Sequence, residues 1–270
     1  MNGRSDVTSH PVGDGSTPVV EVRSITKRYG SIHALHEINM KLFPNEIVGL
    51  VGDNGAGKST LVNIISGALE PTSGQIYVSG REVSFKSPSD ARDAGIETVY
   101  QDLALAPDLS IWANLFLGRE EIVRGPLGWI GWLDRKTMMQ RSVGDLERTR
   151  IRISSVTNRV GRLSGGQRQA VAVGRAVAWG SQVILMDEPT AALGVEQQAK
   201  VADLIKNVAG NGTPVLLISH NIPQVYEICD RILVLFHGRI IAELRPSETH
   251  VDEIVSWITG AALFGAKANA

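Results

Sequence analysis

The chain lacks the features that would place it across a membrane or in an oxidising compartment. It has no run of 18 or more apolar residues, so we expect no membrane-spanning helix. Residues 1–18 are polar and have no apolar signal-peptide core, which predicts a disordered leader and no secretion signal. The single cysteine, Cys229, cannot form an internal disulfide, and its apolar neighbours predict a small buried side chain in a helix. We therefore expect a cytoplasmic protein.

An excess of charge of one sign is also missing, as are internal repeats and sustained heptads. The 27 Lys and Arg residues are balanced by 28 Asp and Glu residues, which leaves no global positive field for nucleic acid. This balance is still compatible with a local basic patch. Without repeats or heptads we expect neither tandem domains nor a long coiled coil. The 270 residues, 43% of them hydrophobic, suffice for one or two globular domains with a sizeable core.

A glycine-rich loop lies between a predicted strand and a predicted helix. Residues 46–51 form a short apolar, β-branched run, and residues 58–68 carry apolar side chains at helical spacing. Glycines in such a loop allow positive φ angles and bring backbone N–H groups close to phosphates. The loop consists of Gly52, Asp53, Asn54, Gly55, Ala56, Gly57, Lys58, Ser59 and Thr60. This order of strand, loop and helix predicts a P-loop for a nucleoside triphosphate.

Two side chains of the loop have predicted roles beside the phosphates. Lys58 would place a positive charge near the β- and γ-phosphates, and the Ser59 hydroxyl would bind Mg²⁺. The helix that follows directs the positive end of its dipole at the same anion. The alternative is an ordinary glycine-rich turn, and average glycine usage gives such a chance match odds of about one in a hundred.

A second candidate anion site precedes the predicted helix 165–179. It consists of Ser164, Gly165, Gly166 and Gln167, directly after Leu163. These residues bring free N–H groups, a hydroxyl and a helix N-terminus together. The residues alone leave two possibilities open, because the segment could hold a separate anion or face the nucleotide from outside.

Two carboxylates end the apolar run of residues 183–188. Asp187 is predicted to hold Mg²⁺, because a hard cation takes oxygen ligands beside phosphates. Glu188 is predicted to polarise the attacking water as a general base, which is worth roughly 10²- to 10⁴-fold in rate. The alternative for this run by itself is a buried strand that ends in solvated acids.

The order of these motifs resembles that of ABC-type ATPases. The resemblance implies ATP and Mg²⁺ as ligands, and it implies that the Ser164 segment completes the ATP site of a second copy of the chain. It also gives roles to three further residues, for which the alternatives are a strand aromatic, a polar strand end and a strand-end histidine. These are Tyr29, which would stack on adenine, Gln101, which would sense Mg²⁺ and the γ-phosphate, and His220, which would contact the γ-phosphate.

One motif departs from the family pattern. Most members have Ser-Ala-Leu-Asp shortly after the strand that ends in the two carboxylates, which is called the Walker B strand in this family. The aspartate of that segment reaches across the dimer, whereas this chain has Ala191, Ala192, Leu193 and Gly194 after Pro189 and Thr190. This departure puts the communication between the two ATP sites in question. Since Glu188 is retained, we still expect hydrolysis.

The pattern of elements predicts an α/β fold. We expect antiparallel strands within residues 19–43 and 75–80, then an α/β alternation of helices 165–179, 196–209 and 222–229 with strands 183–187, 215–218 and 231–236. This is an ABC cassette with a mostly parallel core sheet, an antiparallel β subdomain and an inserted helical subdomain. The expected divisions are a leader 1–18, an ATPase domain 19–245 containing the helical subdomain at about 90–180, and a C-terminal helix and tail 246–270.

Three functional classes fit a P-loop of this kind. A P-loop kinase would leave the Ser164 segment unexplained. Nucleic-acid ATPases of the family insert long coiled coils between the P-loop and the Walker B strand, and translation-type members carry two cassettes. The sequence therefore favours the motor of a membrane transporter, with no nucleic acid expected as a partner.

Three segments carry a finer resemblance to bacterial monosaccharide importers of the ribose, xylose and fructose type. They are residues 113–120, 188–195 and 218–223, and the single cassette is similar to the fructose-like subgroup, in which a glycine at the position of Gly194 also occurs. This resemblance implies a homodimer bound to permease subunits at the cytoplasmic face of the inner membrane, and indirectly a sugar-binding protein.

An apolar cluster in residues 101–133 is a candidate permease interface, because exposed apolar surface often marks an interaction site. Its members are Trp112, Leu115, Phe116, Trp129, Ile130 and Trp132. The alternative is that these side chains form the small core of the helical subdomain.

Overall fold

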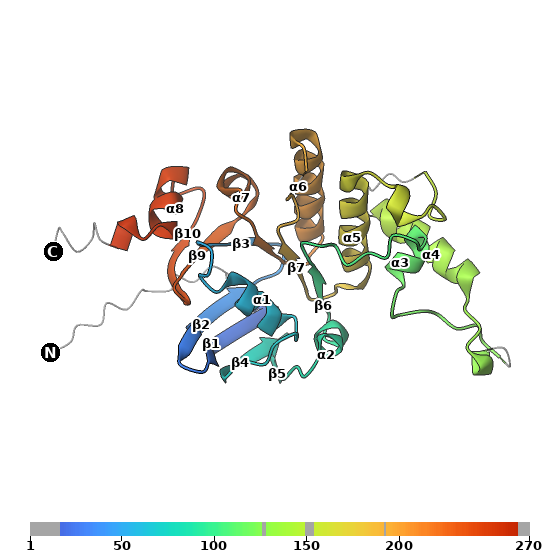
Figure 1. Ribbon diagram of the computed structural model, residues 1–270, viewed down its shortest axis with the longest axis horizontal. Helices are drawn as coiled ribbons and strands as arrows, with labels where there is room; N and C mark the ends of the chain where they lie inside the picture. Colours follow the sequence, from blue (N-terminus) through green and yellow to red (C-terminus); the bar gives the residue numbers. More distant parts are fainter. Residues whose placement is uncertain (1–16, 126–127, 149–153, 192, 264–270) are drawn as a thin grey trace.

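The computed structural model describes residues 17–125, 128–148, 154–191 and 193–263 (Figure 1). The expected leader, except for residues 17 and 18, lies outside the described residues, as do Ala192 and the end of the tail. The first half of the chain gives β1 (Val20–Tyr29), β2 (Ile32–Leu42), β3 (Ile47–Val51), α1 (Lys58–Ile65), β4 (Ser73–Val78), β5 (Arg81–Val83), α2 (Pro88–Asp93), β6 (Ile96–Val99), α3 (Ile111–Leu115) and the 3-10 turn η1 (Gly128–Ile130). The second half gives α4 (Arg135–Arg148), the 3-10 turn η2 (Val160–Arg162), α5 (Gly165–Trp179), β7 (Val183–Asp187), α6 (Val195–Gly210), β8 (Val215–Ile218), α7 (Ile222–Ile228), β9 (Arg231–Phe236), β10 (Arg239–Leu244) and α8 (Val251–Ile258).

Two sheets organise these elements. The six-stranded sheet has the order β10-β9-β3-β8-β7-β6, and its strands from β9 to β6 are parallel while β10 runs antiparallel at one edge. The four-stranded sheet has the order β2-β1-β4-β5 and is antiparallel. The parallel core and the antiparallel region predicted from the sequence are therefore both confirmed.

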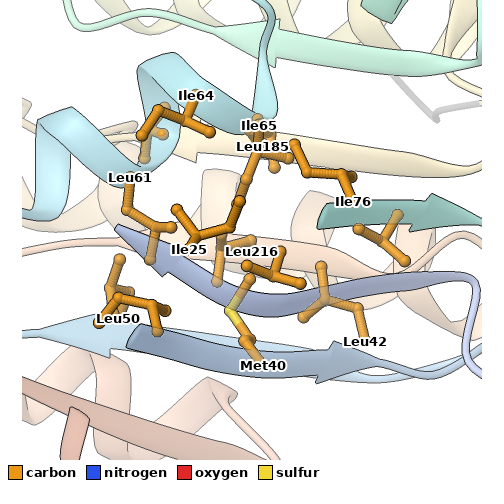
Figure 2. Packing of buried hydrophobic residues seen from close by; sticks show 14 of the residues in the cluster. Ile25, Met40, Leu42, Leu50, Leu61, Ile64, Ile65, Ile76, Leu185 and Leu216 are labelled. Carbon is orange, nitrogen blue, oxygen red and sulfur yellow. The ribbon is translucent and has the colours of Figure 1, made fainter. Parts of the chain in front are cut away.

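Helix α1 packs between the two sheets (Figure 2). Its Leu61, Ile64 and Ile65 side chains are buried in one cluster together with Ile25 of β1 and Leu185 of β7. Helices α5 to α8 cover the opposite face of the six-stranded sheet, above it in Figure 1. Because α1 is fixed by apolar contacts on both sides, the loop that precedes it is held at the end of β3.

Helices α3, α4 and α5 enclose a separate core. Its buried residues are Ile111, Leu115, Phe116, Met138, Leu146, Val160, Leu163 and Val171. Strand β6 is not part of this helical region, because it pairs with β7 in the parallel sheet. The stretch expected as a helical subdomain at about 90–180 therefore begins with one strand of the core sheet.

The observed elements begin and end close to the predicted positions, with one clear difference. Helix α1 was expected to reach residue 68 but ends at Ile65, because Gly67 adopts φ +73°. A Cβ atom on Gly67 would lie 2.5 Å from the carbonyl oxygen of Ser87, so the chain turns there with no side chain.

Cys229 is buried as predicted, directly after the last residue of α7, and burial raises the pKa of its thiol. None of the helices in the described part of the chain has the length and hydrophobicity needed to cross a bilayer.

Candidate functional site

The predicted site residues follow the carboxyl ends of four neighbouring parallel strands. Strand β3 leads into the glycine loop, β7 ends at Asp187, and Gln101 and His220 lie two residues beyond β6 and β8. The strand register places Ile218 beside both Leu50 and Asp187. Since nucleotides bind at this edge of open parallel sheets, one strand end supplies the loop and the others supply its polar neighbours.

Two glycines of the loop make close backbone approaches that no other residue would allow. A Cβ atom at Gly52, where φ is +154°, would lie 2.1 Å from the carbonyl oxygen of Leu235. A Cβ atom at Gly57, where φ is +110°, would lie 2.8 Å from the carbonyl oxygen of Ala34. The loop is therefore pressed against β9 and β2, which glycine alone permits at these two positions.

Lys58 is buried at the start of α1. Its Nζ atom donates hydrogen bonds to the carbonyl oxygens of Gly52 at 2.7 Å and Asp53 at 3.0 Å, which holds the ammonium inside the loop. Burial lowers the pKa of Lys58, and the charges of Glu188, Asp53 and Asp187 oppose that shift. No side chain caps the N-terminus of α1 among the described residues, so its first N–H groups stay available to an anion.

The two carboxylates after β7 differ in environment. Asp187 is half-buried, and burial raises its pKa while Lys58 lowers it. Glu188 adopts φ +51°, a strained angle for a residue with a side chain, and its N–H donates to the carbonyl oxygen of Ile218 at 2.9 Å. This backbone bond to β8 fixes the direction in which the Glu188 side chain leaves the sheet.

His220 faces Glu188. Its Nε2 atom lies 3.4 Å from Oε1 of Glu188, and this oxygen is buried and accepts no hydrogen bond within the described residues. Burial raises the pKa of Glu188, and the charge of His220 acts against this shift. A buried carboxylate oxygen without a hydrogen bond suits a general base, because it has a free lone pair for a water molecule.

The loop after β6 carries Gln101 with its side chain exposed. Leu103 and Ala104 adopt positive φ angles of 62° and 44°, and the guanidinium of Arg175 in α5 donates to the carbonyl oxygens of both residues, at 3.0 Å and 2.7 Å. Sequence analysis missed Arg175. The sequence feature that could have indicated Arg175 is its position as an arginine in the otherwise apolar later part of helix 165–179.

Tyr29 is the last residue of β1, and half of its surface is exposed. The ammonium of Lys27 lies 5.3 Å from the centre of its ring. The ring is therefore accessible to a planar ligand, and stacking on adenine stays a prediction.

Ser164 is the N-cap of α5. Its hydroxyl accepts a hydrogen bond from the N–H of Gln167 at 3.3 Å, and the Gln167 side chain accepts one from the N–H of Ser164 at 3.0 Å. Within the described residues, no hydrogen bond or ion pair joins residues 164–167 to residues 52–60. Within a single chain the predicted site residues therefore form two separate groups, one at the strand ends and one at the start of α5.

Gly194, the position that departs from the family pattern, is the N-cap of α6. Its N–H donates to Oε1 of Gln197 at 2.9 Å, and a Cβ atom at position 194 would lie 2.7 Å from the same oxygen. Gln197 also packs on the second anion segment, because a Cβ atom on Gly166 would lie 3.0 Å from its Cγ atom. Gln197 is a second residue that sequence analysis missed, and its signal was a Gln three positions after a potential N-cap.

A cavity of about 330 Å³ lies between the Gln101 loop and the helical region. Its walls come from α2, β6, α3 and α5. We call it the groove, and its lining residues include Tyr100, Ala104, Leu115, Leu117 and Trp179.

The apolar cluster predicted near this groove divides into two parts. Leu115 and Phe116 are each 1% exposed and belong to the helical core, so the interface interpretation is wrong for these two residues. Trp129, Ile130 and Trp132 are 94%, 73% and 60% exposed, and their segment projects away from α3 and α4 (Figure 1). Trp112 is half-buried against the core.

Comparisons with known proteins agree with this arrangement. Residues 35–191 match the ABC transporter family. The chain is 47% identical to the fructose import ATP-binding protein FrcA of Rhizobium meliloti, covering 90% of this chain and 95% of that protein. It is 49% identical to the xylose/arabinose import ATP-binding protein XylG of Sulfolobus acidocaldarius, covering 91% and 95%. It is 36% identical to the ribose import ATP-binding protein RbsA 2 of Escherichia coli O157:H7, of which it spans only 47%.

Solved structures give the same result. A nucleotide-free ATP-binding cassette from an ABC transporter superposes with a TM-score of 0.75 at 26% identity, covering 89% of this chain and 96% of that one. A dimeric cassette in a post-hydrolysis state, bound to ADP and Pi, superposes with a TM-score of 0.68 at 27% identity, covering 84% and 98%. From its sequence match, its fold and its strand-end residues, this chain belongs to the ABC transporter family, as an ATP-binding cassette.

Proposed function

We propose that the chain is the ATP-hydrolysing subunit of an importer for a monosaccharide. The observation that carries this proposal is the 47% and 49% identity, over nearly the whole chain, to import ATP-binding proteins named for fructose and for xylose/arabinose. The alternatives, a nucleic-acid or ribosomal ATPase or a motor for another substrate, have no comparable observation in their favour.

Hydrolysis begins with the phosphates bound to the glycine loop that follows β3. Lys58 and the N-terminus of α1 bind the β- and γ-phosphates, and Tyr29 stacks on the adenine. Glu188 takes a proton from the attacking water, and His220 contacts the γ-phosphate while it orients the Glu188 carboxylate.

Mg²⁺ fits the oxygen-bearing residues of this site. Within the described residues no group of three His, Cys, Asp or Glu side chains forms a metal cluster, so the phosphates must supply part of the coordination. Ser59, Asp187 and Gln101 all offer oxygen atoms and follow the ends of β3, β7 and β6. When bound, the ion would neutralise charge on the β- and γ-phosphates.

Two copies of the chain are needed for the complete site. Because no hydrogen bond or ion pair joins residues 164–167 to residues 52–60 in the part of the chain that the structure describes, we propose that the partner copy supplies this segment to the γ-phosphate. A cassette that is similar to this chain is dimeric when bound to ADP and Pi, which supports a dimer of cassettes. Gln197 would brace the segment through its contact with Gly166.

The permease is proposed to bind in the groove beside the Gln101 loop, which would place the chain at the cytoplasmic face of the inner membrane. The exposed Trp129, Ile130 and Trp132 would extend this interface. A sugar-binding protein would deliver the substrate to the permease and would not contact this chain.

Uptake measurements test the proposal. Cells that depend on this chain should accumulate labelled fructose, xylose or ribose, and a Glu188→Gln chain should not support uptake. ATP hydrolysis by the isolated chain without uptake of any monosaccharide would assign the motor to another substrate.

A further inference from the structure

We propose that Gln224, in the first turn of α7, is a positioning residue for hydrolysis: through its bond to Thr190 it holds the His220 loop against the loop that carries Glu188. This inference rests on the proposed roles of Glu188 and His220 and adds a residue that acts through them. It starts from the way in which the two loops are joined.

Glu188 and His220 stand on two loops that follow neighbouring strands. Glu188 comes directly after β7 and His220 two residues after β8, and 55% of the His220 side chain is exposed. The 3.4 Å between Nε2 of His220 and Oε1 of Glu188 is longer than a usual N–H···O hydrogen bond. The pair by itself therefore holds the two loops together only weakly.

A buried hydrogen bond joins the loop after β7 to α7. The Thr190 hydroxyl donates to Oε1 of Gln224 at 2.7 Å, across 34 positions of sequence. Thr190 is 3% exposed and Gln224 is 8% exposed, so water competes little for either group. This bond is therefore the stronger fastening between the two segments.

Thr190 is coupled to Glu188 by a short, stiff piece of backbone. Only Pro189 lies between them, and its ring fixes the φ angle. The N–H of Ala191 donates to the carbonyl oxygen of Glu188 at 3.1 Å, which closes a turn over residues 188–191. A shift of Thr190 would therefore move Glu188 as well.

Gln224 is also tied to the His220 loop. Its N–H donates to Oδ1 of Asn221 at 3.3 Å, which is the N-cap interaction of α7. Asn221 directly follows His220, and its own N–H donates to the hydroxyl of the buried Ser219 at 3.1 Å. The residues on both sides of His220 are thus bonded to each other, and Gln224 holds one of them.

The position of the His220 loop matters for the charge on Glu188. The charged groups that act on the pKa of Glu188 are His220 and Lys58, which lower it, and Asp187, which raises it. Of these three, His220 stands on the loop that Gln224 holds. A looser loop would therefore weaken the effect of His220 and leave the other two in place.

Removing the amide tests the inference. Gln224→Met has a similar volume but cannot accept the Thr190 hydrogen bond, so it should lower the kcat of ATP hydrolysis by roughly tenfold or more, because a small misplacement of catalytic groups is costly. ATP affinity should stay the same, and the acid limb of the kcat profile should move to higher pH, as expected for His220→Gln.

The other end of the bond supplies a second variant and its control. Thr190→Val removes the donor with little change of shape and should have the same effects, which keeps the test open if Gln224→Met does not fold. Thr190→Ser keeps a hydroxyl and should retain most of the hydrolysis. Gln182→Met is the matched control, because it breaks a hydroxyl–amide bond of 2.6 Å to Ser79 at the opposite end of β7 and should leave kcat unchanged.

The His220→Gln background separates positioning from a general loss of stability. If Gln224 acts through His220, Gln224→Met should change kcat by less than about twofold in that background. An equal loss in both backgrounds, or a wild-type kcat and acid limb in Gln224→Met, would overturn the inference. Normal hydrolysis by Glu188→Gln, or no sugar uptake with the wild-type chain, would instead overturn the proposed function, so the two failures are distinguishable.

Discussion

The Nε2 atom of His220 lies 3.4 Å from Oε1 of Glu188, across the ends of two neighbouring strands. Glu188 is held there by a strained φ angle and by a backbone bond to Ile218, while 55% of the His220 side chain remains exposed. The proposed base is therefore rigid and shielded, and its histidine partner is accessible to solvent and ligand. This difference leads to the first two predictions.

Glu188→Gln should retain ATP binding and lose hydrolysis by roughly 10²- to 10⁴-fold, because the amide cannot accept a proton. Equilibrium binding and single-turnover hydrolysis separate the two effects. Glu227→Gln, an exposed glutamate on α7, is the matched control and should hydrolyse ATP normally. Hydrolysis at the wild-type rate by Glu188→Gln would remove Glu188 from the mechanism.

The pH dependence should follow the raised pKa of Glu188. A general base works only when it is ionised, so hydrolysis should be full above this pKa and fall as the pH drops through it, at a higher pH than for a free glutamate. Because the charge of His220 lowers this pKa, His220→Gln should move the acid limb of the kcat profile further up. An acid limb at the same pH in both proteins would show that the two groups are not coupled.

Linked dimers should reveal whether Ser164 acts on the partner site. With Lys58→Ala in one subunit and Ser164→Arg in the other, a shared site leaves one of the two sites intact, so part of the ATP hydrolysis should remain. With both changes in the same subunit each site has one defect, and hydrolysis should be lost. The reverse pattern would mean that Ser164 serves the site of its own chain.

Gly52→Ala should destabilise the chain by about 1–3 kcal/mol, because the added Cβ would lie 2.1 Å from the carbonyl oxygen of Leu235. Gly80→Ala is a control at φ +76° with no atom within 4 Å of the added Cβ, so it carries backbone strain alone. Denaturant unfolding and ATP affinity should show a loss of both stability and binding at Gly52, and of stability alone at Gly80. Equal losses of stability and of ATP affinity in Gly52→Ala and Gly80→Ala would show that the close approach of Gly52 to β9 has no role.

The apolar cluster supplies a pair of opposite predictions. Trp129→Glu should leave the melting temperature unchanged and impair uptake, because its side chain is 94% exposed. Phe116→Glu should lower the melting temperature strongly, since loss of a buried Phe costs about 3–5 kcal/mol and an unpaired charge would be buried as well. A large drop in melting temperature for Trp129→Glu would place this tryptophan in the core.

The sequence by itself determined the parallel sheet and the residues at its carboxyl edge. Short apolar runs such as residues 47–51 and 183–187 become buried strands wherever they pack, and the loop after each strand must emerge at the same edge. For this reason local sequence pattern is enough to locate Lys58, Asp187, Glu188 and His220 at that edge. It does not determine the distances between them, nor that Oε1 of Glu188 accepts no hydrogen bond within the described residues.

Only the tertiary structure decided which apolar and charged side chains find partners. The sequence placed Phe116 and Trp129 in one apolar cluster with the same two alternatives, an interface or a core. In the structure Phe116 packs against Trp179 and Trp129 is exposed, because burial depends on which elements the fold brings together. Arg175 reaches the loop at Leu103 and Ala104, which lie 72 and 71 positions earlier in the sequence, at hydrogen-bonding distance. Contacts of this kind depend on how helices and sheet pack together, and local spacing carries no record of them.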